Sequence, residues 1–137
     1  MSAKPRIVVD TNVLISQNLS PRSLPARAVA RAVNSSIILM SDATLFEITE
    51  TLFRKKFDKY FSAPAREKFL ADFEQMATRI EVTTRIQACR HPKDDKFLEL
   101  AVDGQANLIL SGDQDLLVLS PFRGVPVVTP MQYLAED

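Results

Sequence analysis

Four acidic residues are the side chains of this sequence best placed to do chemistry: Asp10, Glu47, Asp94 and Asp113. Asp10 directly follows the apolar run 6–9 (RIVV), and Asp113 follows the run 108–112 (LILSG). Both runs are typical of buried strands, and the carboxyl ends of parallel strands share one edge of a sheet, where ligands bind. Carboxylates gathered there repel one another unless they are protonated or share a cation. Because hard oxygen ligands suit Mg²⁺ or Mn²⁺, this spacing suggests a metal-dependent phosphodiesterase.

Glu47 lies in a predicted helix over residues 42–57. Five apolar residues are predicted to form the buried side of this helix: Leu45, Phe46, Ile48, Leu52 and Phe53. Glu47 lies roughly opposite that side, where a solvent-exposed glutamate also belongs. Glu50 is one turn away and competes for the same role. The helical pattern therefore leaves the choice between the two glutamates open.

Helix capping is the ordinary explanation for the aspartates. Asp10 and Asp113 each precede a short predicted helix and could cap it. Asp94 and Asp95 open another predicted helix, where capping and the helix dipole account for one of them. Each position has such an explanation alone, but several carboxylates at one predicted sheet edge are harder to explain by capping.

Polar residues beside the aspartates could support them. Thr11 and Asn12 could orient Asp10 or a bound water, and Ser111 could position a group near Asp113. Asp115 would bring a further carboxylate to the same edge of the sheet.

Basic residues form two clusters. The first contains Arg54, Lys55, Lys56 and Lys59, and the second contains Arg85, Arg90, His91, Lys93 and Lys96. The second cluster brackets Asp94, and both could hold phosphates. A solvated helix face is the expected role of the first cluster.

Strands alternate with helices along the chain, which predicts an α/β fold with a mainly parallel central sheet. Strands are predicted at 6–9, 36–40, 80–83, 108–111 and 125–128. Helices are predicted at 11–15, 24–33, 42–57, 64–78, 94–105, 116–119 and 130–135, with a loop at 17–23. Pro126 places the last strand at an edge of the sheet, because proline cannot donate to a ladder in mid-sheet.

The composition fits one soluble domain. The chain has 137 residues and a single cysteine, Cys89, so an intrachain disulfide is excluded. Its 17 Lys and Arg balance 17 Asp and Glu, so it lacks the basic excess common in nucleic-acid binders. No apolar run is long enough for a signal peptide or a membrane helix. We therefore expect a cytoplasmic protein that does not enter a membrane.

Taken in order, the motifs resemble those of the PIN-domain (PilT N-terminus) family of nucleases. The motifs are 8–14 (VVDTNVL), a helical glutamate at Glu47, 94–101 (DDKFLELA) and 110–116 (LSGDQDL). The resemblance covers about residues 5–134 and is nearest to the VapC-like toxins of toxin–antitoxin pairs. It implies a single domain over 1–137 and a three-layer α/β/α sandwich with an acidic cleft.

The resemblance also implies roles for individual residues. Asp10, Glu47, Asp94 and Asp113 match the catalytic acids. Divalent metal, Mg²⁺ or Mn²⁺, would be held by Asp10, Asp94, Asp113 and Asp115. Thr11, Asn12, Asp95 and Ser111 would support the site or position the substrate. The implied activity is endoribonuclease cleavage of RNA, with an antitoxin protein as partner and a homodimer as an option.

Four other functions compete with this one, and the sequence disfavours the last three. A catalytically inactive module of the same fold could bind nucleic acid or a protein partner. A phosphoaspartyl hydrolase would have Asp-x-Asp after the first strand, where this chain has Asp10-Thr11-Asn12, and a receiver domain would have a lysine near Ser111. A Ser–His–Asp triad is disfavoured because no serine lies in a nucleophile-elbow pattern.

Overall fold

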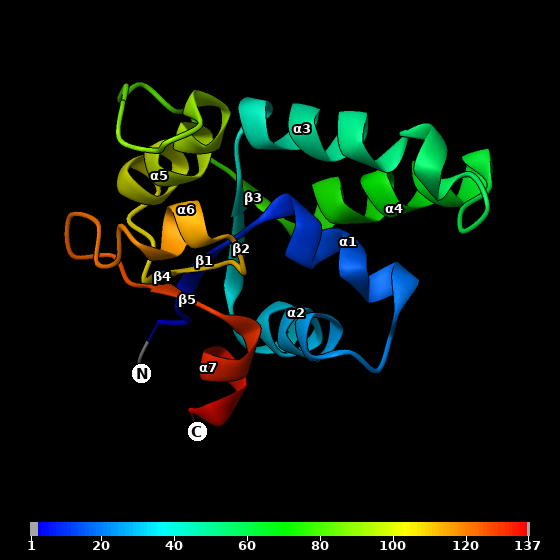
Figure 1. Cartoon of the computed structure of the whole chain (residues 1–137), viewed down its shortest axis with the longest axis horizontal. Helices are drawn as coiled ribbons and strands as arrows, with labels where there is room; N and C mark the ends of the chain where they lie inside the picture. The colour runs from blue at the N-terminus through cyan, green and yellow to red at the C-terminus, as the bar shows by residue number, and fades with distance from the viewer. Residues whose placement is uncertain (1–2, 137) are drawn as a thin grey trace.

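The computed structural model describes residues 3–136 and contains one five-stranded sheet between helical layers (Figure 1). The strands are β1 (Arg6–Val9), β2 (Ile37–Met40), β3 (Thr78–Arg79), β4 (Leu108–Leu110) and β5 (Val127–Val128). They lie in the order β3-β2-β1-β4-β5, and every neighbouring pair is parallel. The expected α/β/α sandwich is confirmed, and β5 lies at an edge. Positions 1–2 and 137 of the predicted domain lie outside the described residues.

The connections between strands are mostly helical. The helices are α1 (Thr11–Leu19), α2 (Leu24–Ser35), α3 (Asp42–Leu52), η1 (Lys55–Phe57), α4 (Ala63–Met76), η2 (Pro92–Asp94), α5 (Asp95–Asp103), α6 (Gln114–Leu117) and α7 (Pro130–Ala135). Helices α1, α2, α4 and α7 contribute to the core on one face of the sheet, and α5 and α6 to the core on the other. Within residues 3–136, none of these helices has the length and apolar character needed to cross a membrane.

The central strand β1 shows why the sheet is covered on both faces. Ile7 and Val9 belong to the core under α1 and α2, whereas Val8 belongs to the core under α5. All three are less than 8% exposed. Since successive side chains of a strand point to opposite faces, an uninterrupted apolar run is what a doubly covered parallel strand requires.

The strand predicted at 80–83 is wrong. The ladder with β2 involves only Thr78 and Arg79 of β3, and it is followed by one bond from the Ile80 amide to the Met40 carbonyl. The next amides bind side chains of α5 instead. Asp103 accepts hydrogen bonds from the amides of residues 83 and 84, and Glu99 from that of residue 86. This segment is extended, so its sequence resembles that of a strand. Its amides bind side chains of a helix, however, and not a neighbouring strand.

The helix predicted at 42–57 is shorter and packs differently from expectation. It ends at Leu52, and the separate turn η1 follows. Ile48 and Leu52 are buried, but Phe46 is 68% exposed and Phe53 is 41% exposed. The rest of the buried side is supplied by two threonines, Thr44 and Thr51. Helix α3 packs against α1 and α5. The predicted buried side was too wide, because it included Phe46 and Phe53, which are exposed.

The remaining differences concern element ends. Helix α1 continues to Leu19, through part of the predicted loop 17–23. The strand predicted at 125–128 is confined to β5. The other predicted elements lie within a few residues of the observed ones.

Candidate active site

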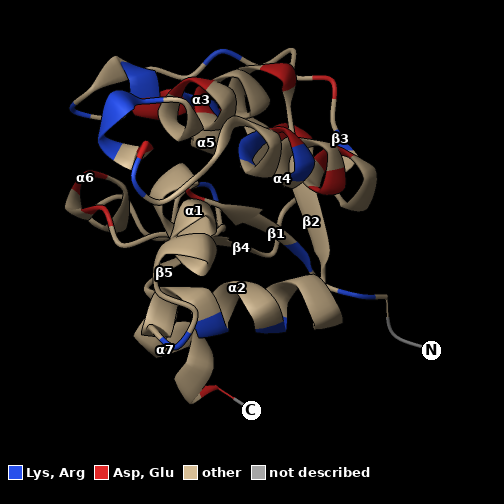
Figure 2. Ribbon diagram, turned by 90° about the vertical axis from the view of Figure 1, so that its right-hand side faces the viewer, with Lys and Arg blue, Asp and Glu red and all other residues tan. Residues whose placement is uncertain are grey.

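A cavity of about 310 Å³ opens at the carboxyl ends of β1 and β4. It is lined by Asp10, Thr11, Asn12, Glu47, Thr51, Arg54, His91, Lys93, Asp94, Asp113 and Asp115. The four predicted catalytic acids therefore come together from four separate segments. Figure 2 shows acidic and basic segments side by side where α3, α5 and α6 lie, whereas the ribbon of α2 carries only basic ones.

Asp10 joins β1 to α1 and is tied to β4 through one serine. Its Oδ2 accepts a hydrogen bond from Ser111 Oγ (2.7 Å), and its Oδ1 accepts one from the Asn12 amide (3.2 Å), which caps α1. Burial raises the pKa of Asp10, and the negative charges of Asp113 and Glu47 raise it further, against the effect of the two hydrogen bonds. The capping role and a place in the cavity are thus compatible.

Ser111 is fully buried and connects two of the acids. Besides donating to Asp10, its Oγ accepts a hydrogen bond from the Asp113 amide (3.0 Å). Asp113 in turn caps α6 by accepting from the Asp115 amide (2.9 Å). The Asp115 carboxylate lies 3.5 Å from Nε2 of His91, which also lines the cavity. One short hydrogen-bonded chain therefore fixes the edge formed by β1 and β4.

Glu47 projects from α3 toward α1 and α5. Lys96 Nζ lies 2.7 Å from its Oε1, and the Thr11 hydroxyl donates to its Oε2. The side chains of Lys96 and Glu47 are only 20% and 19% exposed. Glu50, the competing glutamate, is exposed and does not line the cavity. The carboxylate of Glu47 is thus held in place by partners on two other helices.

Asp94 and Asp95 are adjacent but have different surroundings. Asp94 lines the cavity and makes no capping hydrogen bond with its side chain. Burial raises the pKa of Asp94, and the charge of Asp113 adds to the increase. Asp95 instead accepts hydrogen bonds from the Cys89 amide (2.7 Å) and the Ala88 amide (3.1 Å). Burial alone would raise the pKa of Asp95, but these bonds lower it.

Four further residues line the cavity that were not among the predicted site residues: Thr51, Arg54, His91 and Lys93. Thr51 lies four positions after Glu47, on the same face of α3, and that spacing could have identified it. Arg54 belongs to the basic cluster that was expected to be a plain solvated face. His91 and Lys93 belong to the cluster that brackets Asp94, as expected from their place in the sequence.

The donor set has the chemistry of a site for a hard divalent cation, because four carboxylates meet where their charges repel. Their spacing is looser than in a formed metal site: among residues 3–136, no three His, Cys, Asp or Glu residues are grouped closely enough to hold an ion. Burial raises the pKa of Asp10 and of Asp94 most, and the negative charge of Asp113 raises both further. The residues therefore fit the ion in type, and closing onto it would require side-chain movement.

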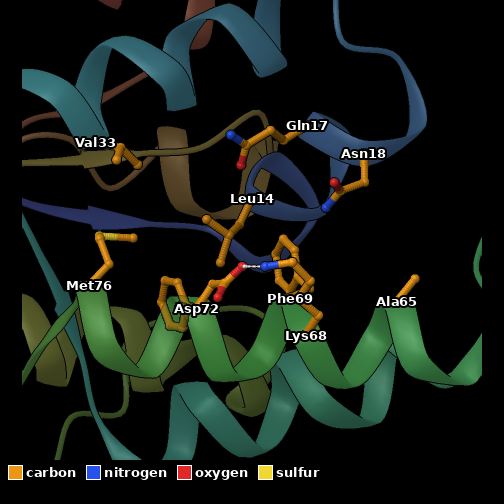
Figure 3. A pocket seen from close by; sticks show the side chains of 10 residues that line it. Leu14, Gln17, Asn18, Val33, Ala65, Lys68, Phe69, Asp72 and Met76 are labelled. Carbon is orange, nitrogen blue, oxygen red and sulfur yellow. Dashed lines mark hydrogen bonds and ion pairs between the residues drawn. The ribbon is translucent and has the colours of Figure 1, made fainter.

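A second, more apolar cavity of about 470 Å³ lies between α1, α2 and α4 (Figure 3). Leu14, Phe69 and Met76 are among its lining residues, and the exposed Lys68–Asp72 pair stands at its side. It shares no residue with the acidic cavity.

Comparison with known proteins places the chain. The sequence pattern of the PIN domain matches residues 6–115. An uncharacterised protein of Methanocaldococcus jannaschii, MJ1680, is 31% identical over 118 residues, which are 85% of this chain and 76% of that protein.

Three solved structures have a similar fold at low sequence identity. VapBC2 from Rickettsia felis, bound to a DNA fragment from its promoter, has a TM-score of 0.61 at 10% identity and covers 90% of this chain and 98% of its own. PAE2754 from Pyrobaculum aerophilum has a TM-score of 0.61 at 13% identity, and the match covers 96% of this chain and 91% of that protein. DNA-bound VapBC from Salmonella typhimurium has a TM-score of 0.55 at 15% identity, and the match covers 92% of this chain and 98% of that protein. With a PIN-domain match over most of its length, an acidic cavity at the expected sheet edge and a relative at 31% identity, this chain belongs to the PIN domain family.

Proposed function

We propose that this protein is a metal-dependent endoribonuclease that hydrolyses RNA phosphodiester bonds. The observation that carries the proposal is the meeting of five carboxylates, from four segments of the chain, around one cavity of about 310 Å³. PIN-domain proteins are typically nucleases that use divalent metal ions. The oxygen-only donor set favours Mg²⁺ or Mn²⁺ over softer metals.

Asp10, Asp94 and Asp113 would hold the ion, with Asp115 beside them. When bound, a divalent ion lowers the pKa of water and offsets charge on the phosphate. The hydrogen bonds from Ser111 and the Asn12 amide to Asp10 fix the direction of that carboxylate.

Glu47 has a different role in the proposal from the three aspartates. Thr11 and Lys96 each occupy one of its oxygens, and each oxygen keeps room for a second hydrogen bond. Glu47 would therefore orient an attacking water rather than bind the ion directly. Lys96 acts through Glu47 and is a positioning residue.

We also propose that residues 5–134 form one nuclease domain that works in the cytoplasm as the toxin of a toxin–antitoxin pair. The likeness in fold to VapBC2 and VapBC, at TM-scores of 0.61 and 0.55, supports this assignment. An antitoxin protein would then be the natural partner, and a homodimer is compatible with the proposal.

One observation favours a second candidate, an inactive module that binds RNA or a protein. The Glu47 carboxylate is neutralised by an internal lysine, and the acids of residues 3–136 are not grouped as a formed metal site. In that case RNA would bind and stay intact with or without metal.

The decisive experiment is cleavage of a structured RNA and a matched single-stranded DNA in Mn²⁺, Mg²⁺ or EDTA. Wild type would be compared with Asp10→Asn and with Asp72→Asn, since Asp72 is an exposed α4 aspartate that pairs with Lys68 outside the acidic cavity. We expect RNA cleavage that needs metal, is lost in Asp10→Asn and is retained in Asp72→Asn. Cleavage that survives EDTA or Asp10→Asn would refute the assignment. Intact RNA bound by the folded wild type would favour the second candidate.

A further inference from the structure

The segment after α3 carries an uncompensated positive charge. Residues 53–60, named here the basic segment, contain four cations: Arg54, Lys55, Lys56 and Lys59. All four are exposed, and none of them forms an ion pair with another residue between positions 3 and 136. The one acid in the segment, Asp58, is paired at 3.0 Å with Arg66, whose side chain is only 8% exposed. Since the whole chain has a formal net charge of zero, this excess is local.

The basic segment is continuous with the acidic cavity. Arg54 lines the cavity, and it follows α3, the helix that carries Glu47. His91 and Lys93 line the cavity as well and come from a segment far away in the sequence. The carboxylates are therefore flanked by cations from two different parts of the chain. A polyanion that enters the cavity would meet positive charge from Arg54 and from Lys93 beside the metal-binding acids.

Exposed aromatic rings are interleaved with these cations. Tyr60 is 57% exposed and Phe53 is 41% exposed. Lys59 Nζ lies 5.4 Å from the centre of the Tyr60 ring, and the Arg66 guanidinium lies 5.5 Å from that of Phe53. A basic surface with exposed aromatic rings is the arrangement that binds single-stranded nucleic acid, because unpaired bases stack on the rings while phosphates bind the cations.

We propose that the basic segment is a docking surface for an unpaired RNA strand that leads into the acidic cavity. Phosphates bind Arg54, Lys55, Lys56 and Lys59, and a base stacks on Tyr60. A paired strand cannot use the ring in this way, because its bases are already stacked on one another. The inference rests on the proposed nuclease function, to which it adds the strand state of the substrate and the surface that receives it.

Binding is measured in EDTA, so that RNA stays intact, with labelled single-stranded and duplex RNA and the full chain. The test variant carries Lys55→Gln, Lys56→Gln and Lys59→Gln. The matched control carries Lys4→Gln, Arg22→Gln and Arg27→Gln, three exposed cations that do not line the cavity. We expect the test variant to bind single strands at least about tenfold more weakly than wild type at low salt, and the control to bind like wild type.

Two further readouts separate docking from general charge. The slope of log Kd against log salt should fall by about 2 in the test variant, because each phosphate contact on a single strand contributes about 0.7. Tyr60→Ala should weaken binding of single strands about 5- to 150-fold and leave duplex binding unchanged. Tyr60→Phe keeps the ring and should restore binding.

Equal binding of single-stranded RNA by the test and control variants would overturn the proposal. It would also be overturned if Tyr60→Ala weakened the binding of duplex RNA as much as that of single strands. Displacement of the RNA by an acidic polypeptide at equal charge concentration would also overturn it, in favour of a protein partner. Cleavage in Mn²⁺ is recorded on the same variants. If wild type cuts RNA but the variants bind it equally well, the docking surface is refuted and the nuclease assignment stands. If binding depends on the basic segment but no variant, including wild type, cuts RNA, the nuclease assignment is refuted and the docking surface stands.

Discussion

Ser111→Ala should destabilise the fold through the loss of one hydroxyl. Ser111 is 0% exposed, and its Oγ links the Asp10 carboxylate (2.7 Å) to the Asp113 amide (3.0 Å). A hydrogen bond to a charged group is worth about 1.5–3 kcal/mol, and a neutral one about 0.5–1.5 kcal/mol. We therefore expect the free energy of unfolding to fall by about 2–4 kcal/mol at pH 7, a large part of the 5–15 kcal/mol typical of a domain.

The loss should depend on pH because one partner is an acid. The Ser111 hydrogen bond lowers the pKa of Asp10 by favouring its charged form. When Asp10 is protonated, the bond becomes an ordinary neutral one and its loss should cost about 1 kcal/mol less. Urea denaturation in EDTA, followed by circular dichroism at pH 7 and at the lowest pH where wild type is folded, measures both values.

Ser36 provides the matched control for this substitution. Its side chain is also buried, at 7% exposed, but its hydroxyl has no hydrogen-bond partner within the part of the chain that the structure describes. Ser36→Ala removes the same atom without breaking a bond, so stability should change by less than about 0.5 kcal/mol or increase. If Ser111→Ala is no more destabilising than Ser36→Ala at pH 7, the link between β1 and β4 does not carry the energy assigned to it.

Three further predictions follow from the site and the core. Asp94→Asn should abolish RNA cleavage with little loss of stability. Asp95→Ala should lower the free energy of unfolding by about 1–3 kcal/mol, because two backbone amides lose their acceptor. Cleavage rates and urea midpoints for both variants test this, and a reversed pattern would contradict it. The pKa of Asp10 is raised in the fold, so the native state retains a proton that the unfolded state has released. The contribution of Asp10 to stability should therefore fall as pH rises above 3.8. The stability of Asp10→Asn relative to wild type should rise with pH over that window in metal-free urea titrations, and a flat difference would refute the assignment. Gly104→Ala would place a Cβ 2.6 Å from Leu39 Cδ1 and 2.8 Å from a helix carbonyl oxygen; thermal melting should show a loss of about 1–3 kcal/mol, and an unchanged melting temperature would mean that α5 shifts freely.

The choice between neighbouring acids needed the structure. Asp94 and Asp95 both suit the start of a helix, and the sequence pattern does not distinguish them. In the fold, Asp95 binds the amides of residues 88 and 89, so it holds the extended segment rather than the cavity. That partner segment becomes visible only when the chain is folded. The strand wrongly predicted at 80–83 has the same cause, because amides of that stretch also bind side chains of α5.

The parallel sheet and the position of its acidic edge follow from local patterns in the sequence. Uninterrupted apolar runs before Asp10 and Asp113 predict strands covered on both faces, and the strand direction then places the two aspartates together. These are local properties of period and order. The pairing of Lys96 with Glu47 and the place of Arg54 in the cavity, by contrast, could not be predicted before the chain was folded. Both depend on how α3 meets α1 and α5, and contacts between segments so distant in the chain are set by packing rather than by any local pattern.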